Sequence, residues 1–148
     1  MNETRATVEP LQTTLAGEHA AVFVLGVLGG RTSRSATPAL YDAVSAAYAA
    51  HRARRDQLVR EITDLGATPV AAEAVYEVPR PLDTPDQVTR AALEVERGCA
   101  ATYSWLVANT AGADRRRAIT ALNEAAVREL VFRGTPEMFP GANEYADR

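Results

Sequence analysis

The chain has 148 residues and a formal net charge of −3, so we expect one domain with its own apolar core and no general nucleic-acid-binding role. Its single cysteine, Cys99, excludes an intramolecular disulfide and a metal site built from several cysteines. The N-terminus carries two acids and no positively charged start before an apolar run, so no secretion signal is predicted. The apolar stretch 20–30 is too short to cross a bilayer, and we expect a cytoplasmic protein with no membrane partner.

The first predicted helix covers residues 10–29. Pro10 suits a first helical turn, and Gly29 and Gly30 suit a helix end. Apolar residues recur at three- and four-residue steps, which places them on one face of the helix together with a single acid. This face holds Leu11, Leu15, Glu18, Val22 and Leu25.

The second predicted helix covers residues 37–65. Thr37 is the expected N-cap, Pro38 follows at the first helical position, and Gly66 suits the residue after the helix end. Its inward face contains one histidine among apolar residues: Leu40, Val44, Ala47, His51, Leu58, Ile62 and Leu65.

Residues 66–83 form a long connection with three prolines and no helical period. A connection of this length is uncommon inside a compact domain, but a bundle in which the chain crosses from one end to the other requires one. Only residues 70–78 have any strand character. We therefore expect a crossover between the second and third helices.

Two further helices are predicted over 84–111 and 114–133. Pro85 follows a candidate cap, Thr84 or Asp83, and Asp114 is the candidate cap of the last helix. The inward face of the third helix holds Ala92, Glu96, Cys99, Tyr103 and Leu106, and that of the fourth holds Ile119, Leu122, Ala126, Glu129, Leu130 and Phe132.

The tail 134–148 contains two prolines and two glycines and is predicted to be irregular. Met138 and Phe139 are expected to anchor it to the bundle, and residues from Glu144 onward to be loose. Together these elements predict an all-α protein: a single domain over 1–148, folded as an antiparallel four-helix bundle with a long crossover.

Each predicted helix carries one ionisable residue near the middle of its apolar face. Burying a charged group costs several kcal/mol unless it is paired, protonated or bound to a metal. The intervals between these residues match, because Glu18 and His51 are 33 residues apart and so are Glu96 and Glu129. We therefore expect the four residues to share one polar layer in the core.

Three segments carry a family resemblance: "LAGEHAAVFVLGVLGG", "AYAAHRARRDQL" and "FRGTPEMFPG". With the two helical hairpins and the inward carboxylates, they resemble the ferritin-like superfamily, and more closely a small uncharacterised ferritin-like family of high-GC Gram-positive bacteria. The resemblance covers nearly the whole chain. It implies a ferritin-like fold and supplies no activity.

The ligand pattern departs from that of di-iron members of the superfamily, in which two helices each give a Glu and two each give Glu-x-x-His. Tyr48 stands where a Glu should precede His51. On the last helix, Ala126 and Glu129 take the Glu and His positions. We therefore expect a degenerate site with no cofactor, in a binding or structural protein that is more plausibly not an enzyme.

Two alternatives remain open at this point. A single Fe, Mn or Zn ion could bind to Glu18, His51, Glu96 and Glu129, as in a metal-storage protein or an oxidoreductase. A different helix register would instead turn Glu94 and Glu124 toward the core. Arginines near both residues on the helix are more typical of solvated faces. These arginines are Arg90 and Arg97 for Glu94, and Arg117 and Arg128 for Glu124.

Further residues are expected around the polar layer. Tyr48 is predicted to offer its hydroxyl to the carboxylates, and Arg55 to neutralise Glu18 or Glu129. Cys99 is expected to be an apolar filler, and His19 to contact the crossover or an interface.

An unidentified small molecule could bind in this layer, and the glycine-spaced first helix favours a homodimer. The full candidate set is Glu18, Tyr48, His51, Arg55, Glu96, Tyr103 and Glu129.

Overall fold

A computed structural model of the chain describes residues 2–142, with side chains described from Val8 onward. Within these residues the protein is all-α, and the segment 70–78 forms no strand. The four helices are α1 Asn2–Gly29, α2 Pro38–Asp64, α3 Pro85–Asn109 and α4 Gly112–Arg133. The all-α prediction and the long crossover between α2 and α3 are confirmed.

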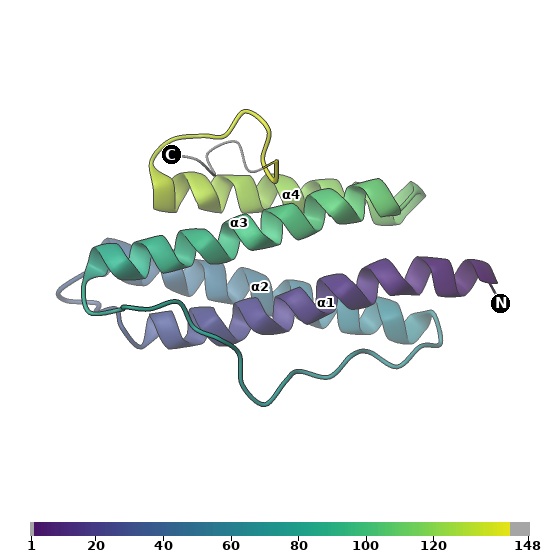
Figure 1. The fold of residues 1–148 in the computed structure, drawn as a ribbon, viewed down its shortest axis with the longest axis horizontal. Helices are drawn as coiled ribbons and strands as arrows, with labels where there is room; N and C mark the ends of the chain where they lie inside the picture. The colour runs from purple at the N-terminus through teal and green to yellow at the C-terminus, as the bar shows by residue number, and fades with distance from the viewer. Residues whose placement is uncertain (1, 143–148) are drawn as a thin grey trace.

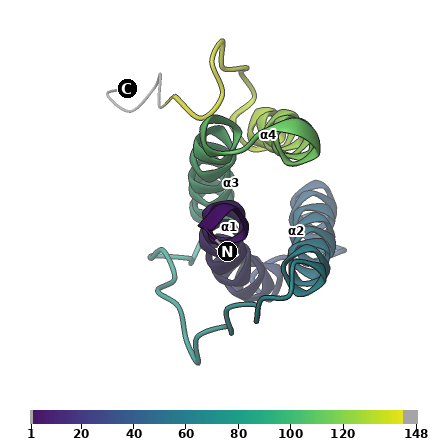
Figure 2. The same cartoon turned by 90° about the vertical axis from the view of Figure 1, so that its right-hand side faces the viewer.

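The helices form two antiparallel hairpins, α1–α2 and α3–α4 (Figure 1). The crossover returns the chain along the length of the bundle, so α2 and α3 run in the same direction. Seen end-on, α1 packs against α2 and α3, and α3 packs against α4, whereas α2 and α4 lie further apart and touch at few positions (Figure 2).

Several predicted helix ends are wrong, for local reasons. α1 begins at Asn2, and Pro10 lies inside the helix, where only one backbone donor is missing. Thr37 precedes α2 as predicted, but its hydroxyl accepts from Ser33 N at 2.9 Å and makes no cap within the helix. α4 begins two residues before Asp114, whose carboxylate pairs with Arg117.

The start of α3 follows its sequence signature closely. Thr84 Oγ1 accepts from Gln87 N at 3.3 Å, and Gln87 Oε1 accepts from Thr84 N at 3.1 Å, which completes a capping box. Pro85 occupies the first turn, where its missing N–H costs nothing. The end of the long crossover is therefore fixed by local hydrogen bonds.

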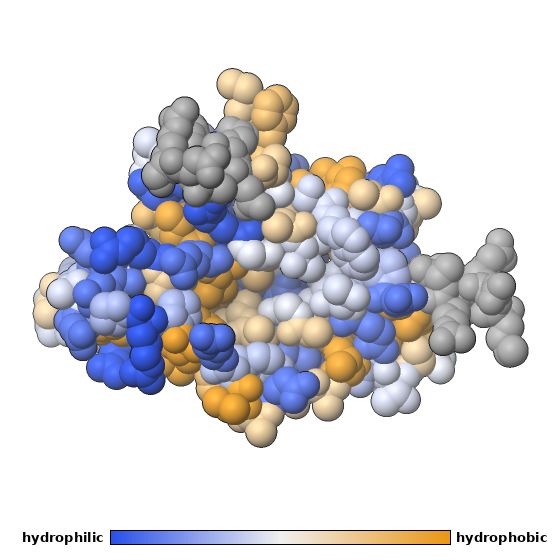
Figure 3. Space-filling view, viewed as in Figure 1, coloured by the Kyte–Doolittle hydropathy of each residue, from blue (hydrophilic) through white to orange (hydrophobic). Residues whose placement is uncertain are grey.

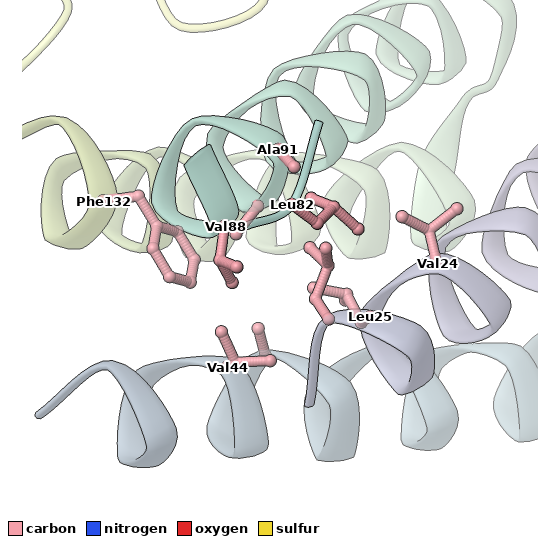
Figure 4. Packing of buried hydrophobic residues seen from close by; sticks show 10 residues of the cluster. Val24, Leu25, Val44, Leu82, Val88, Ala91 and Phe132 are labelled. Carbon is pink, nitrogen blue, oxygen red and sulfur yellow. The ribbon is translucent and has the colours of Figure 1, made fainter. Parts of the chain in front are cut away.

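The core has a cluster of large apolar side chains at each end of the bundle and a layer of mostly small side chains in the middle. One end is the cluster in Figure 4, where Val88, Val44 and Phe132 come from three helices and Leu82 joins them from the crossover. The opposite end contains Leu15, Leu58, Ile62 and other residues. The middle layer is built from small side chains around one tyrosine: Ala21, Cys99, Ala100, Tyr103, Ala121 and Ala125.

The crossover is held against the outer side of α1. Gln12 donates to Thr68 O and accepts from Val70 N, each at 2.7 Å, and His19 Nε2 lies 3.0 Å from Val70 O. The Phe23 and Tyr76 rings lie 5.5 Å apart. The predicted contact of His19 with the crossover is confirmed.

The predicted inward face of α4 is partly wrong. Ile119 and Leu130 are exposed, while Glu129 and Phe132 are buried as expected. The remaining buried positions are the alanines 118, 121 and 125. Apolar side chains occur on both sides of this helix, so periodicity does not identify the inner one; alanine faces α3 because only small side chains permit the close approach of these two helices.

The anchor of the tail also differs from the prediction. Met138 and Phe139 are 79% and 63% exposed. The tail instead approaches the bundle at Gly141, where an added Cβ would lie 2.7 Å from Ala100 O on α3 and where φ is +82°. Glu137, which is paired with Arg133, is a second attachment point. Residues 143–148, including the segment predicted to be loose, lie outside the described part of the chain.

Part of α1, Val8–Gly29, is long and apolar enough to cross a membrane by length and composition. The core helix of a soluble bundle passes the same test. In this structure 44% of the segment's most apolar window is buried inside the protein. The buried Glu18 lies near the middle of the segment, in contact with other helices.

Truncating Phe132 tests the packing of α4. Phe132→Ala should lower the free energy of unfolding by about 3–5 kcal/mol, because it opens a cavity in a cluster shared by four helices. The neighbouring change Val131→Ala, at an exposed position, should change it by less than about 0.5 kcal/mol. Urea unfolding followed by circular dichroism measures both, and equal effects would contradict the observed orientation.

Candidate functional site

His51 lies at the centre of a buried charged cluster that joins α1, α2 and α3. Its Nδ1 is 2.7 Å from Glu18 Oε2, and its Nε2 is 3.2 Å from Glu96 Oε1. All three side chains are at most 1% exposed. Both ring nitrogens thus face carboxylate oxygens, an arrangement that is fully satisfied only when both carry a proton.

The second oxygen of Glu18 is also occupied. Tyr103, which α3 places in the middle layer, donates its hydroxyl to Glu18 Oε1. Burial and the nearby Glu18 charge raise the pKa of Tyr103 well above its usual range, so the phenol keeps its proton. Glu18 therefore accepts from α2 and α3 at once.

Arg128 of α4 completes the cluster by binding Glu96. Its Nε lies 3.0 Å from Oε1 and 2.9 Å from Oε2 of that carboxylate. Burial alone would lower the pKa of Arg128, but the charge of Glu96 and the hydrogen bonds to it raise the pKa instead. One carboxylate from α1 and one from α3 thus meet one cation from α2 and one from α4, so the cluster is neutral overall.

The electrostatics of the cluster favour imidazolium at His51. Burial lowers the pKa of His51, but hydrogen bonds and charge interactions with Glu18 and Glu96 outweigh it and raise the pKa from 6.5 to about 9. This agrees with the geometry, in which each ring N–H has its own acceptor.

Cys99 lies beside the same cluster. A carboxylate oxygen of Glu18, a ring nitrogen of His51 and Cys99 Sγ all lie within 4.8 Å of one another. Burial, with the nearby carboxylates of Glu18 and Glu96, raises the pKa of the Cys99 thiol well above its usual range. Cys99 packs among small residues as expected, but its sulfur also belongs to the only group of three possible metal ligands found in the described chain.

Glu129 belongs to a separate cluster near the C-terminal end of α4. Arg133 donates to Glu129 Oε2 at 2.5 Å and lies 3.0 Å from Glu137 Oε1. Burial raises the pKa of Glu129, Arg133 opposes this, and the neighbouring Glu137 adds to it. Glu129 is buried as predicted, but it is not brought together with Glu18, His51 and Glu96.

Two other predicted members do not join the polar layer. Arg55 pairs with the adjacent Asp56 at 2.7 Å instead of neutralising Glu18 or Glu129, because its side chain leaves α2 toward solvent. Tyr48 is half-buried beneath the Arg52 guanidinium, 5.8 Å from the ring centroid. Among the hydrogen bonds described for the chain, none joins its hydroxyl to the core carboxylates.

The alternative register is excluded by exposure. Glu94 lies on the surface of α3, and Glu124 is 53% exposed and pairs with Arg54 across the α2–α4 seam at 2.9 Å. Beneath that seam lies a cavity of about 20 Å³ lined partly by Tyr103 and Thr14, which has room for about one water.

Sequence reasoning missed Arg128, Arg133 and Glu137. The sequence places Arg128 on a solvated face because the predicted inner face of α4 is rotated away from it. Glu137 lies in the irregular tail, where no periodicity exists. One signal was available for Arg133, since it follows Glu129 by four residues and such pairs face each other on a helix.

The raised pKa of His51 predicts a pH-dependent stability. The native protein keeps a proton that the unfolded chain releases between pH 6.5 and about 9, so this contribution is complete below pH 6.5 and is lost as pH rises toward 9. The slope should approach at most about 1.4 kcal/mol per pH unit, measured by urea unfolding. His51→Gln should remove it, whereas His19→Gln, at the other histidine, should retain it.

The protonation of the His51 ring can be measured directly by NMR. The His51 ring resonances should titrate near pH 9 and not near 6.5. Equal pH slopes in the wild type and His51→Gln, or a normal titration of His51, would contradict the imidazolium assignment.

Comparison with known proteins places this geometry in a family. The family model described as "Domain of unknown function (DUF4439)" matches residues 10–144. The crystal structure of a conserved hypothetical protein, Rv2844, from Mycobacterium tuberculosis is similar with a TM-score of 0.79 at 28% identity, over 88% of this chain and 89% of that chain.

A ferritin-like, diiron-carboxylate protein from Bacillus anthracis is similar with a TM-score of 0.62 at 16% identity, over 90% of this chain and 92% of that chain. At this identity the likeness concerns the fold alone. No match is found among curated proteins. The predicted ferritin-like fold is confirmed, and the chain belongs to the DUF4439 family.

Proposed function

We propose that this ferritin-like protein acts as a binding or structural module whose core is held by ion pairs and does not house a di-iron centre. The proposal rests on one observation: every oxygen of the two core carboxylates, Glu18 and Glu96, already accepts a hydrogen bond from the protein. The donors are Tyr103, His51 and Arg128. We place this module in the cytoplasm.

The residues present do not fit a di-iron centre. Such a centre draws on four carboxylates and two histidines from the four helices, whereas the cluster here has two carboxylates and one histidine. Arg128 also brings a fixed positive charge to Glu96 at 2.9 Å. A divalent ion beside this guanidinium would be repelled in a poorly solvated interior, so we derive no iron-dependent step.

A neutral internal network suits a scaffolding role. Truncating one partner of a buried ion pair typically costs about 3–5 kcal/mol, because the other charge remains buried and uncompensated. The cluster therefore makes the four-helix arrangement depend on residues from every helix. In this proposal the cluster holds the two hairpins in one fixed packing. The outer surface of the protein is therefore also fixed and can be recognised by a partner.

Elemental analysis tests this proposal. Protein purified without chelators should contain no stoichiometric iron or manganese, because the core carboxylates are already neutralised. A ferritin-like di-iron protein prepared in the same way is the positive control. One or two iron or manganese ions per chain would refute the proposal.

The second candidate function is zinc binding, and one observation favours it. Ligand atoms of Glu18, His51 and Cys99 approach within 4.8 Å of one another, and carboxylate, imidazole and thiolate are all ligands of Zn²⁺. Binding would require the release of protons from His51 and Cys99 and the loss of the His51–Glu18 hydrogen bond. Glu96 and Glu129, which the sequence offered as ligands, are outside this group.

Zinc titration separates the two candidates. If the second function holds, the wild type should retain one zinc per chain after dialysis at neutral pH, and Cys99→Ser should lose it. Glu129→Gln is the matched control, because Glu129 lies in the separate cluster and should leave zinc uptake unchanged. Retention of zinc by Cys99→Ser would remove the second candidate.

A further inference from the structure

The segment from the α1–α2 turn along most of α2 is basic although the protein as a whole is acidic. Residues 31–60 contain six arginines and two aspartates. Arg54 and Arg55 are engaged by acids of their own chain. The exposed Arg31, Arg34 and Arg52 have no ion-pair partner within residues 8–142. The positive charges of these three arginines are therefore not neutralised by an ion pair within the described side chains.

An open groove lies between the end of α1 and the start of α2, and Tyr48 in its lining lies beneath the Arg52 guanidinium. Its volume is about 260 Å³, and its lining includes Leu25, Val44 and Tyr48. Glycines of α1 form part of its floor, so a partner can approach the backbone closely. Arg34 and Arg52 stack on tyrosine rings of α2, with distances of 5.7 Å and 5.8 Å from guanidinium carbon to ring centroid.

The same chain contains a segment of complementary character in its crossover. Residues 66–86 have four acids and one arginine. Within this segment Val75 is 71% exposed, and Glu73 and Glu77 are exposed on either side of it. Tyr76 instead turns inward against Phe23, so the crossover is held while its valine and acids face outward.

The crossover that carries the acidic segment runs along α1 on the side away from α4 (Figure 2), and the groove lies between α1 and α2. Along the edge formed by the crossover, apolar side chains stand beside hydrophilic ones (Figure 3). Arg52 lies over Tyr48 of the groove, and Arg34 lies over Tyr41, which is three residues before Val44 on the same face of α2. An exposed valine between two acids matches an apolar groove with these arginines near it in both hydropathy and charge. The two surfaces are thus complementary to each other.

We propose that the partner of this module is a second copy of the chain, with the Glu73–Val75–Glu77 segment of each copy seated in the α1–α2 groove of the other. A two-fold axis makes the exchange reciprocal, because each copy then donates one segment and receives one. Val75 fills the groove, and the two glutamates meet Arg34 and Arg52. The proposal extends the proposed function by naming its partner.

Paired charge reversal tests the interface by sedimentation velocity. The wild type should form a dimer whose dissociation constant rises with salt, because surface charges are screened. Arg34→Glu with Arg52→Glu, and separately Glu73→Arg with Glu77→Arg, should each raise that constant by about tenfold or more. Combining all four changes should restore dimerisation, since the complementary signs are exchanged.

Two valine variants locate the contact. Val75→Ser should weaken the dimer, whereas Val127→Ser, at a 62% exposed position on the outer face of α4, should not. Circular dichroism confirms that each variant is folded. A dimer weakened by Val127→Ser and insensitive to Val75→Ser would overturn the proposal, and so would charge reversal without rescue.

The remaining outcomes are also decisive. A wild type that stays monomeric at high concentration overturns the inference, and so does a monomer that binds vesicles of anionic phospholipid through Arg34 and Arg52. Metal content is measured separately on the same samples. A metal-free monomer would therefore refute this inference alone, and an iron-loaded dimer would refute the proposed function alone.

Discussion

Two carboxylates buried in the middle of the bundle govern the organisation of this protein. Glu18 and Glu96 are inaccessible to water, so each must find its counter-charge and its hydrogen bonds within the protein. His51 forms hydrogen bonds with both carboxylates. Tyr103 donates to Glu18, and Arg128 donates to Glu96. Because these groups come from all four helices, satisfying the carboxylates fixes the relation between the two hairpins.

The surroundings of the cluster follow from the same requirement. The middle layer is built from alanines and one cysteine, which leave room for the larger polar side chains. The apolar clusters at the two ends of the bundle seal this layer from solvent. Low polarity around the ion pairs in turn strengthens each of them. Burial by itself lowers the pKa of His51, and the hydrogen bonds and charges of Glu18 and Glu96 outweigh this effect and raise it.

The middle layer of the bundle is where this protein differs from di-iron proteins of the ferritin-like fold. Di-iron members of this fold hold four carboxylates and two histidines in the core, whereas the cluster here joins two carboxylates to one histidine and one arginine. A histidine shared by two carboxylates and an arginine bound to one of them provide the positive charge internally. The same fold can thus retain a polar centre, while the groove and the acidic crossover are the surfaces through which we propose that the chain interacts.

The sequence by itself determined the helices, the crossover and the burial of Glu18, His51, Glu96 and Glu129, because helical periodicity and proline positions are local signals. It could not determine which of these residues meet, since contact depends on the rotation and tilt of each helix. Arg128 joined the cluster and Glu129 left it because alanines, not the larger apolar residues, face α3 on the last helix. That choice depends on how closely two helices can pack, and only the tertiary structure decided it.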